Sequence, residues 1–185
     1  MSQRPYRIML VEPESSLLEL LVDAIIRRLD AVVTCAVTTD QCLDNELHDP
    51  HDLVIAELQA PSCGGLLLAQ RLRSLGNRPV ILLADEITQE ETAAAMRLGV
   101  RDVLVKPFPV EDLLDSAETV LREYVTQVRR AARHRRLRDT VRRVIRERRE
   151  LNHRIDLLCR DLVGSHRRLV NRVAEIEADV IQRSK

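Results

Sequence analysis

Residues 52–65 read DLVIAELQAPSCGG, and this stretch decides how the rest of the chain is interpreted. Leu53–Ala56 is a short, continuous apolar run that ends on an acid, Glu57. Such a run, bounded by polar and turn-forming residues, is typical of a β-strand buried on both faces. Pro61 and the Gly64–Gly65 pair mark the following loop. The stretch therefore predicts a central strand that carries a carboxylate to its C-terminal end.

Similar short apolar runs lie on both sides of this strand. They predict strands at residues 7–11, 31–37, 80–84 and 102–105. Between them lie amphipathic segments that predict helices at residues 17–29, 39–47, 66–75 and 88–98, and a last helix from about residue 110. Strands that alternate with helices indicate an α/β fold, with a parallel sheet covered on both faces.

In a parallel sheet of this kind, ligand chemistry is found at the C-terminal ends of the strands. The residues at those ends are Glu12, Glu57, Ala84 and Lys106. We therefore expect any functional pocket of this domain at the edge of the sheet where these four residues meet.

Composition narrows the class of protein further. Hydrophobic residues make up 45% of the 185 residues and aromatic residues only 2%, so the core must consist of Leu, Val, Ile and Ala. No apolar run approaches the roughly 20 residues of a membrane span. The four cysteines are scattered and accompany no histidine cluster, which argues against a zinc site and for reduced thiols in the cytoplasm. We expect no metal and no membrane contact.

Three motifs carry a resemblance to a known family: VEPE at 11–14, DLVIAEL-x-x-P-x-x-x-G at 52–65 and VLVKPF at 103–108. Through them, residues 5–124 resemble the receiver domain of bacterial response regulators. The resemblance implies a doubly wound, flavodoxin-like sheet with strand order 2-1-3-4-5. It also implies a cis peptide bond between Lys106 and Pro107, because cis bonds are nearly confined to proline.

The chain departs from the family at the positions that handle phosphate. Receivers use two adjacent acids after the first strand, an aspartate after the third, a hydroxyl after the fourth and a lysine after the fifth, with Mg²⁺ held by the acids. Here Glu12 is followed by Pro13, Glu57 replaces the aspartate, and Ala84 replaces the hydroxyl. Val103 stands at the position of the family's switch aromatic, so only Lys106 and Pro107 are intact.

The resemblance therefore implies a degenerate phosphoacceptor pocket: Glu12, Glu57, Ala84, Lys106 and Pro107. We expect no catalytic residue, no cofactor and no firm Mg²⁺ site. Glu57 can reach Lys106, which either fixes the domain in one state or simply satisfies a buried charge. Glu14 either replaces the missing second acid or, as we favour, only complements the start of a helix.

Charge divides the chain into two parts. Residues 1–126 hold 11 basic and 21 acidic side chains, a balance of −10, whereas residues 127–185 hold 18 and 8, a balance of +10. Together with the extent of the resemblance, this predicts a receiver-like domain at 1–124 and an arginine-rich helical region at 125–185.

Apolar residues of the tail recur at alternating steps of four and three, with one stutter. The pattern predicts a coiled-coil seam that is interrupted by Arg148 and Ser165 and consists of Leu137, Val141, Val144, Leu151, Ile155, Leu158, Leu162, Leu169, Val173, Ile176 and Val180. So narrow a stripe needs a partner helix. We favour a parallel homodimer over a hairpin that turns near Gly164.

Eleven arginines lie between Val128 and Arg149. They include a basic face that we take as a partner-binding surface, made of Arg129, Arg130, Arg133, Arg136, Arg142, Arg143 and Arg146. The favoured function is a phosphorylation-independent, non-enzymatic adaptor that dimerises through the tail and engages a signalling protein. The alternative is a nucleic-acid-binding regulator of transcription or antitermination that uses the basic helix 128–149. An active phospho-switch with unorthodox residues is a third possibility.

Overall fold

The computed structural model describes residues 4–76 and 78–183, and the side chains of residues 170 and 173–183 lie outside that description. Strands and helices alternate along the chain. Their bounds are β1 Tyr6–Val11, α1 Ser15–Arg28, β2 Ala31–Ala36, α2 Thr39–His48, β3 Leu53–Glu57, α3 Gly64–Gly76, β4 Val80–Ala84, α4 Gln89–Leu98, β5 Asp102–Val105 and α5 Val110–Arg183. The predicted strands and helices are all present, and α1 and α3 each begin two residues earlier than expected.

The five strands form one parallel sheet in the order β2-β1-β3-β4-β5, as the resemblance implies. β3 lies at the centre, with Ile8 of β1 opposite Leu53 and Val80 of β4 opposite Val54. Every residue of β3 and β4 is buried. Burial on both faces explains why these two strands read as unbroken apolar runs.

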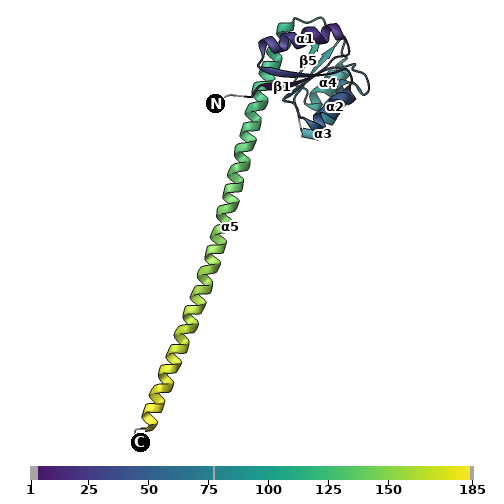
Figure 1. The fold of residues 1–185 in the computed structure, drawn as a ribbon. Coiled ribbons are helices and arrows are strands. Elements are labelled where there is room, and N and C mark those ends of the chain that lie inside the picture. Colours follow the sequence, from purple (N-terminus) through teal and green to yellow (C-terminus); the bar gives the residue numbers. More distant parts are fainter. Residues whose placement is uncertain (1–3, 77, 184–185) are drawn as a thin grey trace. The chain divides into compact units, whose positions relative to one another are not determined.

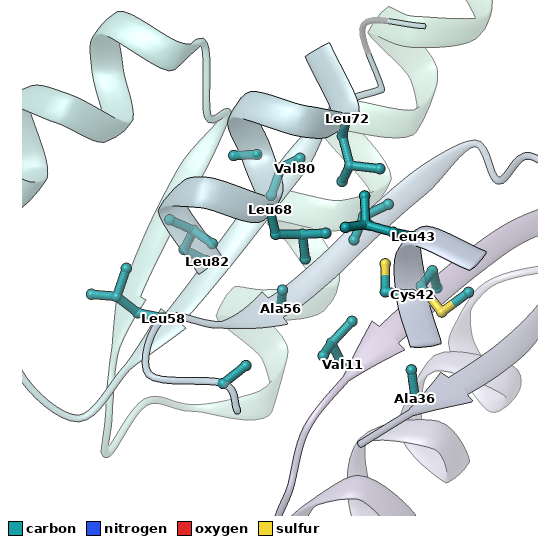
Figure 2. Packing of buried hydrophobic residues seen from close by; sticks show 14 of the residues in the cluster. Val11, Ala36, Cys42, Leu43, Ala56, Leu58, Leu68, Leu72, Val80 and Leu82 are labelled. Atoms are coloured by element: carbon teal, nitrogen blue, oxygen red, sulfur yellow. The ribbon is translucent and has the colours of Figure 1, made fainter. Parts of the chain in front are cut away.

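Helices cover both faces of the sheet (Figure 1). On one face, α2, α3 and α4 pack against the strands. Figure 2 shows the centre of this core, where side chains of α2 and α3 meet side chains of β1, β3 and β4: Cys42, Leu43, Leu68, Leu72, Val11, Ala56 and Leu82. On the other face, α1 and the first turns of α5 bury Leu21, Ile25, Leu113, Ala117 and Leu121 against the sheet. Burial of a side chain of this size contributes about 1.5–3 kcal/mol.

Gly65 brings α3 close to the end of β3. A Cβ atom at this position would lie 2.8 Å from Leu82 Cδ2 and 3.0 Å from the Glu57 carbonyl oxygen. A larger residue would force Leu82 and the Glu57 carbonyl to shift, so glycine suits this close approach. This glycine therefore fixes the loop that frames Glu57.

The chain falls into two compact units, residues 1–129 and 130–185. Helix α5 runs from Val110 to Arg183 and passes through Gly164 without a turn, so the hairpin alternative is wrong. Within the second unit the described side chains of the expected seam, from Leu137 to Leu169, are each about half to two thirds exposed. The seam positions Val173, Ile176 and Val180 lie outside the described side chains.

Candidate functional site at the carboxyl edge of the sheet

The sheet brings the four expected strand-end residues to one edge. β1 and β3 run side by side to Val11 and Ala56, so Glu12 and Glu57 follow at neighbouring positions. Ala84 ends β4 and pairs with Val105, the residue before Lys106. The Lys106–Pro107 peptide bond is cis, as expected.

Lys106 forms ion pairs with two buried carboxylates. Its Nζ lies 2.5 Å from Glu57 Oε2 and 3.2 Å from Glu12 Oε2. The exposed Asp85 is more distant, at 3.8 Å. The expected Glu57–Lys106 contact is therefore present, and Glu12 is a second partner that the sequence did not indicate.

The electrostatics of this cluster keep Lys106 charged. Partial burial lowers the pKa of an ammonium group, but the close contacts with the carboxylates of Glu57 and Glu12 outweigh burial and raise the pKa of Lys106 above its ordinary value. Two carboxylates and one ammonium leave a formal charge of −1. The edge thus holds a fixed excess of negative charge without any modification.

Glu57 is incompletely satisfied. Among the buried side-chain nitrogen and oxygen atoms of the described residues, its Oε2 alone lacks a hydrogen bond. Lys106 approaches this oxygen closely, so the contact is an ion pair that lacks hydrogen-bond alignment. The other oxygen, Oε1, accepts a long bond of 3.5 Å from the Gln59 N–H. Buried polar atoms without a hydrogen bond are rare, and here the Lys106 ammonium at 2.5 Å compensates the charge of the oxygen.

The residues do not fit a magnesium site of the kind the family uses. Pro13 has no ligand atom, and Ala84 has no hydroxyl. The Lys106 ammonium already bridges Glu12 and Glu57. Within residues 4–76 and 78–183, no group of three or more His, Cys, Asp or Glu side chains is arranged to hold a metal ion.

Glu14 does not replace the missing acid. It is the residue before the first turn of α1, and its carboxylate accepts a hydrogen bond from Ser16 Oγ at 2.7 Å. Its backbone N–H donates to Glu12 Oε1 at 3.1 Å, which helps to orient that side chain. Of the two alternatives for Glu14, the helix-start role agrees with this geometry.

The arginines of the expected basic face lie on α5 and are exposed from Arg129 to Arg146. None of them forms an ion pair with another described residue. At 3.6 residues per turn, Arg142 and Arg146 fall on the side of the helix away from Val141 and Val144. Arg130 and Arg133, however, precede the seam residue Leu137 by seven and four residues, so they fall on the same side of the helix as the seam.

Sequence reasoning missed a second buried polar cluster, at the opposite edge of the sheet. His51 Nδ1 lies 2.5 Å from Glu46 Oε1, and the His51 backbone N–H donates to the same oxygen at 3.0 Å. His51 Nε2 lies 2.9 Å from Thr34 Oγ1. Arg78 Nε lies 3.7 Å from Glu46 Oε2, and the same guanidinium donates to the Tyr124 hydroxyl.

Asp52 completes this cluster. It accepts hydrogen bonds from Arg4 at 2.7 Å and from the Arg7 backbone N–H at 3.0 Å. The polar run Asp49–Asp52 directly before a buried strand was the available signal. Nothing in the sequence links that run to Glu46, Thr34 or Arg78.

A family model described as the response regulator receiver domain matches residues 8–118. The transcriptional regulatory protein BaeR of Escherichia coli O6:H1 is 28% identical over 116 residues, which cover 63% of this chain and 48% of BaeR. The response regulator ArlR of Staphylococcus epidermidis is 34% identical over 80 residues, which cover 43% of this chain and 36% of ArlR. The chain thus spans less than half the length of these two relatives.

Solved structures show the same fold. A CheY-like receiver domain protein from Methanospirillum hungatei superimposes with a TM-score of 0.63 at 18% identity, over 66% of this chain and 98% of that one. The non-phosphorylated HemR receiver domain from Leptospira biflexa gives a TM-score of 0.59 at 26% identity, over 63% of this chain and 94% of that one. No helix in the described part of the chain is both long and apolar enough to be a membrane span.

Proposed function

Since the chain belongs to the response regulator receiver domain family through residues 8–118, we propose that it is a signalling adaptor that works without phosphorylation. In this proposal the receiver-like unit is a non-enzymatic protein-binding head. The arginine-rich helix dimerises the chain and presents an output surface. The partner is a signalling protein of unknown identity.

The observation that carries the proposal is the Glu12–Lys106–Glu57 cluster. Transfer of a phosphoryl group requires positive charge and hydrogen-bond donors around the oxygens that gain charge. Here the one ammonium is bound to two carboxylates, and position 84 is an alanine. A permanent carboxylate at Glu57 supplies negative charge beside Lys106 and supports a head that stays in one state.

Treatment with acetyl phosphate in the presence of Mg²⁺, read by intact-protein mass spectrometry, tests this proposal. We expect the native chain to remain unlabelled. The matched variant restores the family's residues through Pro13→Asp, Glu57→Asp and Ala84→Thr, and we expect it to gain label. Stoichiometric phosphorylation of the native chain would overturn the proposal and favour the active phospho-switch.

Dimerisation through the tail is supported by the exposed apolar seam. Leu158 belongs to the seam and is exposed in the single chain, and the neighbouring Leu157 is exposed but lies off the seam. Sedimentation equilibrium should therefore show a dimer for the native chain, weakened by Leu158→Asn and unaffected by Leu157→Asn. A native chain that sediments as a monomer would contradict the dimer.

A nucleic-acid-binding regulator is the second candidate, and the exposed arginines without ion pairs favour it. Phosphate contacts release counterions, so affinity for DNA or RNA should fall steeply with salt. Fluorescence anisotropy with duplex DNA and with RNA at several salt concentrations tests this candidate. Replacement of Arg142, Arg143 and Arg146 by glutamine should then flatten the salt dependence. Binding that is absent at low salt would exclude this candidate.

A further inference from the structure

A pocket of about 500 Å³ lies at the amino edge of the sheet, opposite the Glu57–Lys106 edge. It belongs to the first unit, and its walls come from the start of β1, the segments before β3 and β4, and α5. The lining residues are Arg4, Tyr6, Pro50, His51, Asp52, Arg78, Tyr124, Val125, Val128 and Arg129. A pocket of this volume is large enough for a small-molecule ligand.

The lining carries excess positive charge. Three guanidinium groups face one carboxylate, Asp52, which is paired with Arg4. Arg78 is held by Glu46 and by the Tyr124 hydroxyl, so its position is fixed before any ligand arrives. The side chain of Arg129 is exposed and forms no ion pair with another described residue. Guanidinium groups bind phosphate and carboxylate oxygens through paired N–H donors, which makes this an anion-binding surface.

The lining also concentrates the chain's aromatic residues. The whole sequence has two tyrosines, one phenylalanine and no tryptophan, and both tyrosines line this pocket. Tyr6 lies near the start of the first unit in sequence and Tyr124 near its end. Pro50, Val125 and Val128 add apolar surface. Planar rings bind well against tyrosine and arginine faces. In a protein so poor in aromatic residues, this grouping distinguishes the pocket from an ordinary surface crevice.

We propose that this pocket binds a small ligand in which a planar ring is joined to a phosphate group, that is, a nucleoside phosphate. The ring contacts the tyrosines and the apolar wall, and the phosphate is bound by Arg78 and Arg129. Because Tyr124, Val125 and Arg129 belong to α5, the ligand contacts the helix that leaves the receiver-like unit. The inference stands independently of phosphorylation at the opposite edge.

Isothermal titration calorimetry of the full chain with AMP and GMP tests the proposal, with adenosine and inorganic phosphate as separate probes. At least one nucleotide should bind with a Kd below about 1 mM, and more tightly than either half alone. Arg129→Ala should weaken that binding about tenfold. The matched control is Arg142→Ala, an exposed arginine on the same helix outside the pocket, which should bind as the native chain does.

Three results would overturn the proposal. The first is the absence of binding by both nucleotides at millimolar concentration. The second is inorganic phosphate that binds as tightly as the nucleotides, because the rings would then contribute nothing. The third is an equal loss in Arg129→Ala and Arg142→Ala, which would assign the binding to the general charge of the arginine-rich helix.

Discussion

The amino edge and the carboxyl edge of the sheet compensate their buried carboxylates in different ways. Both bury carboxylates, which is costly unless the charges are paired and hydrogen-bonded. At the amino edge, Glu46 and Asp52 accept hydrogen bonds from His51, Arg4 and the backbone. At the carboxyl edge, Glu57 relies on the proximity of one ammonium group, and its Oε2 has no hydrogen bond. The amino edge is built as a stabilising network, whereas the carboxyl edge keeps the frame of a reactive site.

The largest effect should come from Lys106→Met, which removes the cation from the carboxyl edge. Glu12 and Glu57 would then be two buried like charges without a partner. Because removal of one partner from a buried pair is strongly destabilising, we expect a loss of about 3 kcal/mol of unfolding free energy. Urea unfolding followed by circular dichroism measures the loss. The exposed Arg122→Met is the control, and equal stability of the two variants would contradict the assigned role.

The next largest loss of unfolding free energy should come from His51→Ala at the amino edge. It leaves Glu46 Oε1 and Thr34 Oγ1 without the histidine nitrogens that they contact. Buried polar groups left unsatisfied cost about 1–3 kcal/mol, and we expect about 2 kcal/mol here. His48→Ala is the matched control, since His48 is exposed and contacts only a backbone carbonyl of its own helix. A loss in His51→Ala no greater than in His48→Ala would show that the network does not stabilise the fold.

A smaller change in unfolding free energy should follow from Glu57→Gln. It removes a buried charge whose Oε2 has no hydrogen bond and leaves Lys106 paired with Glu12. We expect the unfolding free energy to change by less than about 1 kcal/mol in either direction. Urea unfolding of the variant beside Lys106→Met provides the measurement. A loss as large as that of Lys106→Met would mean that the Glu57 charge is itself needed for stability.

The smallest effect should be seen at alkaline pH, where the carboxyl edge should lose its contribution to stability and the amino edge should not. The pKa of Lys106 is raised above its ordinary 10.5 in the folded state. Its contribution is therefore complete below about pH 10.5 and is lost as the pH rises through the folded pKa. The stability difference between the native chain and Lys106→Met should stay constant from pH 7 to 10 and shrink above pH 10.5. The Asp49 hydrogen bond and nearby carboxylates raise the pKa of Arg7, so Arg7 stays charged over this range.

A difference that shrinks already between pH 7 and 10 would contradict the assignment of this titration to Lys106. The measurement is urea unfolding of both proteins at each pH.

The local pattern of apolar residues in the sequence was enough to predict the strands and which residues lie at the carboxyl edge. β3, β4 and β5 have the expected bounds because buried parallel strands are continuous apolar runs between turn residues. The resemblance supplied the strand order, and that order places Glu57 beside Lys106. The link from Lys106 to Glu12 was missed because it depends on side-chain reach across the gap between two strand ends.

The amino edge was not predictable in the same way. Its contacts join Glu46, His51 and Thr34, which lie on different elements and have no characteristic spacing. The pocket that includes Tyr6 and Tyr124 brings together positions near the two ends of the first unit. Only the three-dimensional fold reveals such a grouping, although the scarcity of aromatic residues could have directed attention to both tyrosines.

Because the apolar stripe of α5 is exposed, the stability of this helix should depend on the concentration of a helix that binds it. In the first unit, the apolar side chains are covered by their own chain, so dilution has no effect on its stability. In the second unit the described seam residues are exposed in the single chain. In the proposed dimer a second helix covers them, and its binding stabilises the helical state by mass action. The helix beyond Arg130 should therefore become more stable as the concentration of its partner rises. Its arginines should then be held more regularly along the helix. If the tail dimerises as proposed, the abundance of its partner sets how much of the tail is ordered.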